Sequence, residues 1–523
     1  MMETDVLVIG GGPAGTWAAV SAARRGARVI LADKGFCGTS GATAPSGTAV
    51  WYVPPDVAAR GKAKATREEL GGFLAHHDWM DAVLETTFAL VNELGERGYP
   101  FPRDVEGRLR QNSLQGPEYM RLMRKLVKGA GARILDHSPA LELLIDADGA
   151  VAGARGIDRR THAGWQIKAK SVVIATGGCA FLSRALGTNN LTGDGYLMAA
   201  EAGAELSGME FSNAYAIAPV FSSVTKTLFY EWASFTDASG AAITGAASKG
   251  GRSVIARALQ QGAVFAQLDR ADGEVRTAMR AAQPNFFLPF DRAGIDPFTQ
   301  PFEITLRLEG TVRGTGGLRL VDQSAATTVP GLYAAGDAAT RELICGGFTG
   351  GGSHNAAWAM SSGAWAGEGA AAFARQCRAG LARTAAPARG PALAGGRGHA
   401  FDPAALIKAV QAEVFPFDTN YFRSGDGLAR SLTRLDSLWR TVRAADGARP
   451  EDALKAREAV AMLATARWMY RSGLARTESR GMHRRYDLTA LDPAQRHHVT
   501  SGGLDEVWTG RVPADGQPLE AAA

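Results

Sequence analysis

The sequence predicts an α/β protein in which a three-layer, Rossmann-like domain is interrupted by an inserted α+β domain and followed by a mostly helical C-terminal region. Three observations support this fold class. The chain opens with a strand, a glycine-rich loop, a helix and a second strand. Residues 206–320 lose that rhythm and are rich in Gly, Pro and aromatic residues, and helical periodicity returns over residues 404–473.

The length of the chain fits this division, because 523 residues exceed one ordinary domain and allow two or three cores. We expect the Rossmann-like domain in two parts, residues 1–205 and 325–374, with the inserted domain at residues 206–324. Residues 375–403 are dense in Ala, Gly, Arg and Pro, which predicts a low-complexity linker. The C-terminal region then covers residues 404–523.

The first elements form a βαβ unit. Residues 4–9 are a short apolar run typical of a buried parallel strand, residues 14–25 predict a helix, and residues 28–32 predict a second strand that ends at Asp33. The sheet therefore begins at the N-terminus.

Helices and then strands are expected after this unit. Residues 56–98 are mainly helical in pattern, and residues 118–128 form an amphipathic stretch. Residues 132–174 alternate like strands around a turn at residues 146–149, which predicts a β-meander that returns to the main sheet.

Composition excludes several classes of protein. The net charge is +5, from 57 basic and 52 acidic residues without long blocks of one sign, so nothing indicates nucleic acid as a partner. No apolar run reaches the roughly 20 residues of a membrane span and no secretory signal opens the chain, so we expect a soluble, cytoplasmic protein. The four cysteines are scattered without a C-x-x-C pair, and no metal site is predicted.

The glycine loop at residues 10–15, G-G-G-P-A-G, predicts a dinucleotide site. Gly10 allows the tight turn, Gly12 the close approach of a pyrophosphate to the helix N-terminus, and Gly15 the packing of helix on strand. Asp33 follows at the place where a carboxylate accepts hydrogen bonds from a ribose diol. This loop alone leaves NAD and FAD open.

Two further strand-to-glycine turns favour FAD. They are S-V-V-I-A-T-G-G at residues 171–178 and V-P-G-L-Y-A-A-G-D at residues 329–337, and the second sets Asp337 toward the pyrophosphate and ribityl chain. The residues predicted to contact the cofactor are Gly10, Gly12, Pro13, Ala14, Gly15, Asp33, Lys34, Ser40, Gly41, Ala42, Ala140, Ala175, Thr176, Gly177, Asp194, Gly336, Asp337, Ser353 and Asn355.

These segments, together with L-T-G-D-G at residues 191–195 and R-T-E-S-R-G-M-H-R-R-Y-D at residues 476–487, resemble the flavoprotein family of succinate dehydrogenase and fumarate reductase. That family includes L-aspartate oxidase and the adenylylsulfate reductase flavoprotein. The resemblance spans nearly the whole chain. It implies an FAD-dependent oxidoreductase that moves a hydride between FAD and a small organic substrate, and it identifies residues 206–324 as the family's capping domain.

The chain departs from this family at the flavin attachment and at the substrate clamp. The histidine that carries covalent FAD in the dehydrogenases corresponds to Ser40, so noncovalent FAD is expected. Two substrate-binding histidines correspond to Tyr215 and Val312, and a substrate-binding arginine corresponds to Thr349. Succinate and fumarate are therefore not expected as substrates.

Three residues are candidates for catalysis. Arg252 lies in a segment, residues 251–257, similar to the family's proton-transferring arginine segment; the alternative is a surface arginine without a chemical role. Tyr215 is a candidate proton donor or carbonyl ligand, or an ordinary half-buried tyrosine. His354 precedes an expected helix and either tunes the flavin or caps that helix.

Other functions stay open from the sequence. One is a catalytic subunit resembling adenylylsulfate reductase, which acts on a heteroatom and passes electrons to a separate iron–sulfur protein. An FAD-dependent nucleic-acid modifier lacks the basic stripe that it would need. A nonenzymatic FAD-binding protein leaves Arg252 and the capping domain without a purpose. The substrate, the electron partner and the oligomeric state do not follow from the sequence.

Overall fold

The computed structural model describes residues 2–103, 106–225, 227–349, 351–377, 386–387, 401–445 and 452–514. The predicted linker at residues 375–403 lies mostly outside the described residues. Within the described ranges, no helix combines the length and hydrophobicity needed to cross a bilayer.

The main sheet follows the order β16-β6-β7-β8-β1-β2-β5, and β15 also pairs with β8. Its central pairs, β2–β1 and β1–β8, are parallel, and most side chains of β1 and β2 are buried. The strands are β1 (Met2–Ile9), β2 (Val29–Ala32), β5 (Arg133–Leu135), β6 (Ala140–Ile145), β7 (Val151–Ile157), β8 (Gly164–Ile174), β15 (Leu332–Ala334) and β16 (Ala386–Pro387).

The expected meander is only partly present. β6, β7 and β8 pair antiparallel around the turn at residues 146–149, as predicted. β5 instead pairs in parallel with β2, because the helix α4 (Gly116–Gly129) before it provides the crossover that a parallel pair requires. The prediction was therefore wrong for β5.

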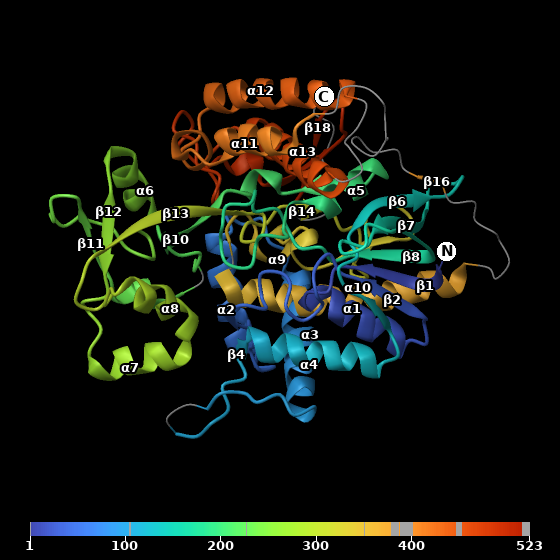
Figure 1. The fold of residues 1–523 in the computed structure, drawn as a ribbon, viewed down its shortest axis with the longest axis horizontal. Helices are drawn as coiled ribbons and strands as arrows, with labels where there is room; N and C mark the ends of the chain where they lie inside the picture. The colour runs from blue at the N-terminus through green and yellow to red at the C-terminus, as the bar shows by residue number, and fades with distance from the viewer. Residues whose placement is uncertain are drawn as a thin grey trace.

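Helices cover both faces of this sheet (Figure 1). On one face, α1 (Pro13–Arg24) packs along α10 (Gly351–Gln376), with α3 (His77–Glu96) and α4 beyond them. On the other, α5 (Asp194–Glu201) contacts β6. Further elements border this domain: α2 (Val57–Leu70), α9 (Glu342–Cys345), and the hairpin of β3 (Gly47–Ala49) and β4 (Ser113–Gln115).

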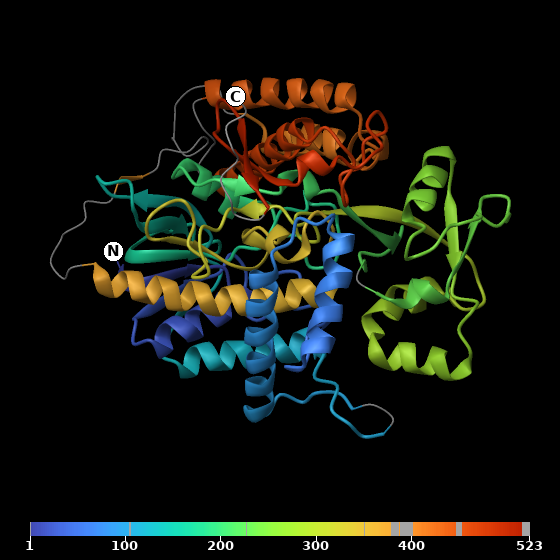
Figure 2. The same cartoon turned by 180° about the vertical axis from the view of Figure 1, so that it is seen from behind.

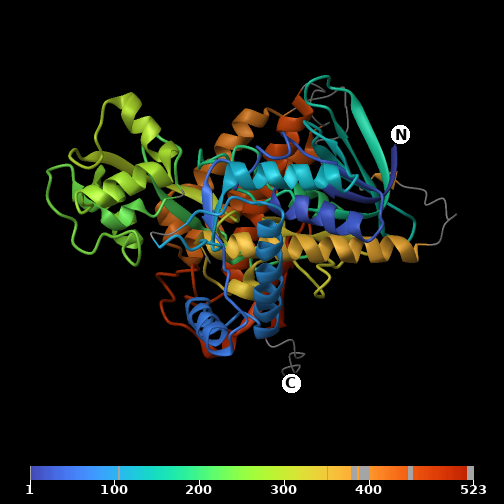
Figure 3. The same ribbon diagram turned by 90° about the horizontal axis from the view of Figure 1, so that it is seen from below.

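The capping domain stands to one side of the molecule (Figures 1 and 3). Its antiparallel sheet has the order β10-β13-β12-β11, and buried phenylalanines of α8 pack beneath it. Its elements are β10 (Ala214–Pro219), β11 (Ser234–Asp237), α6 (Arg252–Gln261), β12 (Val264–Gln267), α7 (Gly273–Ala282), α8 (Pro284–Ala293) and β13 (Phe302–Gly310).

The two segments that lead into and out of the capping domain belong to a different sheet. β9 (Leu206–Ser207) and β14 (Gly317–Leu318) pair with each other, and β9 also pairs with β17 (His497–Gly502), which pairs with β18 (Trp508–Pro513). The self-contained capping sheet therefore spans residues 214–310, inside the expected range of residues 206–324.

The C-terminal region lies over the main domain (Figure 2). Its helices are α11 (Pro403–Val414), α12 (Gly425–Ala444) and α13 (Ala453–Ala475), and both α11 and α12 pack on α13. A buried arginine joins this region to the start of the capping domain, because Arg476 pairs with Glu210 at 2.8 Å and with Glu478 at 2.9 Å. The predicted α/β fold class, with its inserted domain and helical C-terminal region, is confirmed.

Candidate functional site

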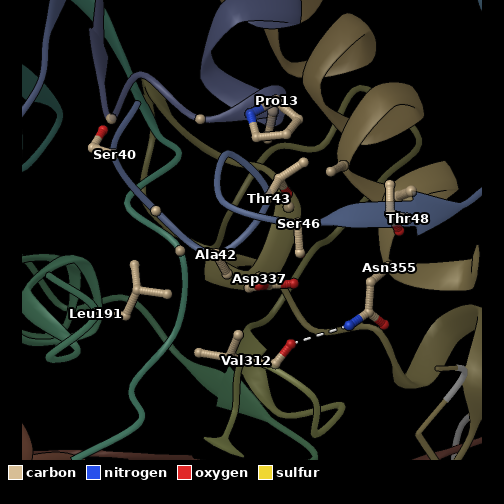
Figure 4. A pocket seen from close by; sticks show the side chains of 18 of the residues that line it. Pro13, Ser40, Ala42, Thr43, Ser46, Thr48, Leu191, Val312, Asp337 and Asn355 are labelled. Atoms are coloured by element: carbon tan, nitrogen blue, oxygen red, sulfur yellow. Dashed lines mark hydrogen bonds between the residues drawn. The ribbon is translucent and has the colours of Figure 1, made fainter. Parts of the chain in front are cut away.

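A cavity of about 540 Å³ runs from the glycine loop to the capping domain, within the size range of small-molecule sites. Its walls come from the ends of β1 and β2, the loop at residues 40–49, residues 335–337 and the start of α10 (Figure 4). The capping domain adds residues 227–229 and 282–283. Every residue predicted to contact the cofactor lines this cavity except Gly15 and Ser353.

The glycine loop has no room for side chains at two of its three positions. Gly10 has a φ of +111°, and a methyl group there would overlap the carbonyl oxygen of Ala175. A methyl group at Gly15 would overlap the carbonyl oxygen of Gly10, which explains why Gly15 packs against the loop and does not line the cavity. These two glycines are required by the protein itself.

Gly12 differs, because a methyl group built there meets no protein atom within 4 Å. Its backbone has ordinary extended geometry, with φ of −75° and ψ of −172°. The residue lines the cavity at the N-terminus of α1, where backbone N–H groups and the helix dipole favour an anion. The space beside Gly12 therefore fits a pyrophosphate and not a neighbouring element of the fold.

Asp33 is held in place by the backbone around it. Its carboxylate accepts hydrogen bonds from Gly11 N at 2.7 Å, from Gly35 N at 2.6 Å and from Ser40 Oγ at 2.9 Å. Burial raises the pKa of this carboxyl group, and the hydrogen bonds oppose that rise. The orientation of the group is thus set before any ribose binds.

Lys34 and Asp194 line the cavity and also pair with each other. Lys34 Nζ lies 2.6 Å from Asp194 Oδ2 and 2.6 Å from Glu458 Oε1. Burial acts to lower the pKa of this lysine, but the two carboxylates outweigh it and the pKa is raised. The pairs join β2 to α5 and to α13, and Glu458 was not identified from the sequence because it lies more than 400 residues from Lys34.

The predicted flavin end of the cavity contains Asp337 and Asn355 (Figure 4). Asp337 pairs with the buried Arg341, and Asn355 Nδ2 donates to Val312 O at 3.1 Å. The other amide atom, Asn355 Oδ1, is buried without a hydrogen-bond partner among the described residues. An unpaired buried acceptor is costly, so it indicates a ligand that brings an N–H or O–H group, and FAD has both.

Ser40 lies at the opposite end from these residues, because its hydroxyl bonds to Asp33. The loop that continues from it along the cavity, residues 41–49, contains no histidine. Among the described residues that line the cavity there is no histidine, cysteine or tyrosine.

Arg252 begins α6 and lies beside the cavity without lining it. Its Nε donates to Ser248 O at 3.0 Å and its Nη1 to Tyr215 O at 3.3 Å. Burial lowers the pKa of this guanidinium, the positive charge of Arg313 lowers it further, and Glu309 opposes both. A buried arginine with a lowered pKa is a better proton donor than an exposed one.

The structure does not bring Tyr215 or His354 into the cavity. Tyr215 is buried, and its hydroxyl donates to Val414 O at 3.0 Å. The His354 ring lies 4.5 Å from the Trp51 ring, and its Nδ1 is 3.1 Å from Ser353 Oγ. This geometry favours the structural alternative for both residues, packing against the C-terminal region for Tyr215 and support of the start of α10 for His354.

Several cavity residues were not identified from the sequence, and the most prominent is Arg313. It directly follows Val312, the position at which the resemblance lacks a histidine. The missing histidine was itself a signal, since an arginine next to the position of a lost histidine indicates that a different ligand binds there. Arg110 and Gln283 also line the cavity, and neither belongs to a motif.

Comparisons with known proteins agree with this site. The family model "FAD binding domain" matches residues 5–220, and the model "Fumarate reductase flavoprotein C-term" matches residues 413–507. L-aspartate oxidase of Streptomyces coelicolor is 28% identical over 549 residues, which cover 95% of this chain and 91% of that protein. A chain of the CoM/CoB fumarate reductase of Methanothermobacter marburgensis is 24% identical, over 95% of this protein and 97% of that chain.

Solved structures share the whole fold. A variant of FrdA from E. coli quinol fumarate reductase superposes with a TM-score of 0.81 at 20% identity, over 100% of this chain and 99% of that one. Adenylylsulfate reductase from Archaeoglobus fulgidus superposes with a TM-score of 0.76 at 21% identity, over 98% and 96%.

The contrast between Gly10 and Gly12 gives a test of the cofactor site. We expect Gly12→Ala to fold with a stability within about 1 kcal/mol of the wild type, because the methyl group meets no protein atom. The same methyl group would occupy the pyrophosphate space, so FAD content should fall at least tenfold and the rise in Tm on adding FAD should disappear. Flavin absorbance per protein and thermal unfolding measure both effects.

Gly10→Ala is the matched comparison, since it adds the same methyl group to the same loop. It should fail to fold or unfold at a much lower temperature. Full FAD occupancy in Gly12→Ala would contradict the assignment of the pyrophosphate space.

Proposed function

Because the chain belongs to the family of FAD-dependent oxidoreductases that share the FAD binding domain and the fumarate reductase flavoprotein C-terminal region, we propose that it transfers a hydride between noncovalently bound FAD and a small organic substrate under the capping domain. The observation that carries this proposal is the single cavity shared by the two domains. Bound FAD supplies the hydride-accepting ring, and the capping domain closes the far side of the same space.

The absence of an attachment residue supports noncovalent FAD. Covalent flavins are joined to proteins through histidine, cysteine or tyrosine side chains, and the described lining of the cavity has none of these. The residues that would hold FAD are the glycine loop, Asp33, Asp337 and Asn355, through hydrogen bonds and the dipole of α1.

Acid denaturation tests the mode of attachment. We expect precipitation with acid to release all of the yellow colour into the supernatant, because no covalent bond retains the flavin. Absorbance of the pellet redissolved in denaturant is the control. Flavin that stays with the protein after repeated washing would refute noncovalent binding.

Arg252 is the proposed proton donor or acceptor. Its guanidinium lies on the capping domain beside the cavity wall, is held by two backbone carbonyls, and has a lowered pKa. Those features let an arginine exchange a proton with substrate while a hydride moves to or from the flavin. Because Arg252 does not line the cavity, its side chain must either move into the cavity or meet the substrate at the cavity's edge.

Substitution of Arg252 tests this role once a turnover assay exists. Arg252→Ala should lower kcat by about 10²- to 10⁴-fold with FAD content unchanged, the usual contribution of a general acid. Arg257→Ala on the same helix is the matched control, because that side chain packs on Phe422 and Tyr486 outside the cavity. Equal turnover in the wild type and Arg252→Ala would remove the assignment.

The substrate is proposed not to be succinate or fumarate. The three positions expected to bind a dicarboxylate in the family lack the groups to do so. The Tyr215 hydroxyl is hydrogen-bonded to the α11 backbone, Val312 has an apolar side chain, and Thr349 stands where an arginine is expected. Each lost charge-assisted hydrogen bond costs about 1.5–3 kcal/mol, so the loss of three leaves little affinity for a dicarboxylate.

Anaerobic photoreduction tests the proposed reaction directly. We expect the absorbance of oxidised flavin at about 450 nm to bleach and to return when a suitable acceptor is added. Millimolar fumarate should not restore it, and millimolar succinate should not reduce the oxidised enzyme. Return within seconds in air indicates an oxidase, and persistence indicates a dehydrogenase or reductase. Turnover of either dicarboxylate, or a flavin that no acceptor reoxidises, would contradict the proposal.

A second candidate is a catalytic flavoprotein like that of adenylylsulfate reductase. It is favoured by the glycine-serine-histidine segment at the start of α10, and the scattered cysteines require that any iron–sulfur centre be on a separate protein. Purification of the native protein with a cysteine-rich partner would favour this candidate, and purification without one favours the first.

A further inference from the structure

The flavin end of the cavity contains Arg313, a charged residue that belongs to none of the family motifs in this sequence. Arg313 follows Val312, whose carbonyl oxygen accepts a hydrogen bond from Asn355 (Figure 4). Arg313 lines the cavity, and its Nε lies 3.5 Å from Glu309 Oε2. Glu309 is buried, and its other oxygen accepts a hydrogen bond from Thr225 Oγ1 at 2.8 Å.

Arg252 lies close to the charges of Arg313 and Glu309. Arg252 Nη1 donates to Tyr215 O at 3.3 Å, and Tyr215 pairs with Leu308, the residue before Glu309, so Arg252, Glu309 and Arg313 form one cluster of charges. In agreement with this placement, the charge of Arg313 lowers the pKa of Arg252 and the charge of Glu309 raises it. The third neighbour that affects Arg252 is the neutral Tyr421. Two guanidinium groups and one carboxylate leave the cluster with one excess positive charge beside the cavity.

Other charged groups that line the cavity already have partners within the protein. Lys34 pairs with Asp194 and Glu458, and Asp337 pairs with Arg341. The neighbouring capping-domain wall, residues 227–229 and 282–283, is neutral. Arg110 also lines the cavity, but it is exposed, where solvent and salt screen its charge. Among the described residues that line the cavity, the Arg313 cluster is therefore the group whose excess positive charge a ligand can neutralise.

We propose that Arg313 binds the carboxylate of a substrate that carries a single negative charge, a monocarboxylic acid, at the flavin end of the cavity. The inference rests on the proposed function, and it names the class of substrate. A monocarboxylate neutralises the cluster, with Arg313 donating N–H groups to its two oxygens. A dicarboxylate would leave one ionised group without a cation in a partly enclosed space, which is unfavourable.

Glu309 determines the preference for a monocarboxylate over a dicarboxylate, because its negative charge offsets one of the two guanidinium charges. Replacing it by glutamine keeps a hydrogen-bonding side chain of nearly the same shape and leaves two uncompensated guanidinium groups. The cluster then carries two positive charges and should favour a dianion. A purely structural role for these residues does not produce such an exchange of preference.

The test is a titration of the FAD-loaded protein with propionate and with succinate at constant ionic strength, followed through the change in flavin absorbance and in Tm. We expect saturable binding of propionate and at least tenfold weaker binding of succinate to the wild type. Arg313→Gln should weaken propionate about tenfold or more, and Arg313→Lys should recover part of the loss. Glu309→Gln should reverse the order of the two acids.

Arg280→Gln is the matched control, because it removes the same charge from the capping domain at an exposed pair with Asp291. It should bind propionate like the wild type. Equal propionate affinity in the wild type and Arg313→Gln, tighter binding of succinate than of propionate to the wild type, or no response to either acid would overturn the proposal. FAD content and photoreduction of the same samples report separately on the proposed function, so the two can fail independently.

Discussion

The close contact between the glycine loop and the end of β8 is the constraint on which the rest of the structure depends. Only residues without side chains allow β1 to turn into α1 while the backbone touches Ala175. That contact brings the N-terminus of α1, the carboxyl ends of the parallel strands and the carboxylate of Asp33 to one edge of the sheet. The cavity exists because segments that are far apart in the chain meet there.

The charged groups at the two ends of this cavity differ in whether the protein itself pairs them. Around the cofactor space, Lys34 and Asp337 are paired within the protein, and the pair of Lys34 with Glu458 also joins the main domain to α13. At the capping end, one positive charge of the Arg252, Arg313 and Glu309 cluster is left over. A cofactor common to a whole family needs a rigid cradle of paired groups, whereas a substrate can be selected by a single uncompensated charge.

Two of the positions at which the sequence is expected to differ from the family, Tyr215 and Val312, lie within residues 206–324, the range assigned to the capping domain. The capping domain is attached through β9 and β14, which pair with each other and, through β9, with C-terminal strands, so its base is anchored on two sides. Loops at the free end of such a module tolerate change because the cofactor cradle does not depend on them. The fold is shared with FrdA at about 20% identity, and this division allows groups around a substrate to change without loss of the cofactor cradle.

The sequence by itself determined the Rossmann-like unit, the cofactor and the position of the inserted domain, because these follow from local signals. The signals are strand and helix periodicity, the spacing of Gly10, Gly12 and Gly15, the acid at Asp33, and the two later strand-to-glycine turns that favoured FAD. Only the tertiary structure decided that β5 is parallel, that Tyr215 bonds to α11, and that Arg252 lies near the pair of Arg313 and Glu309. Such contacts join residues far apart in the chain, and neither periodicity nor motif spacing encodes the distance between two side chains. The chemistry of the substrate end depends on those distances.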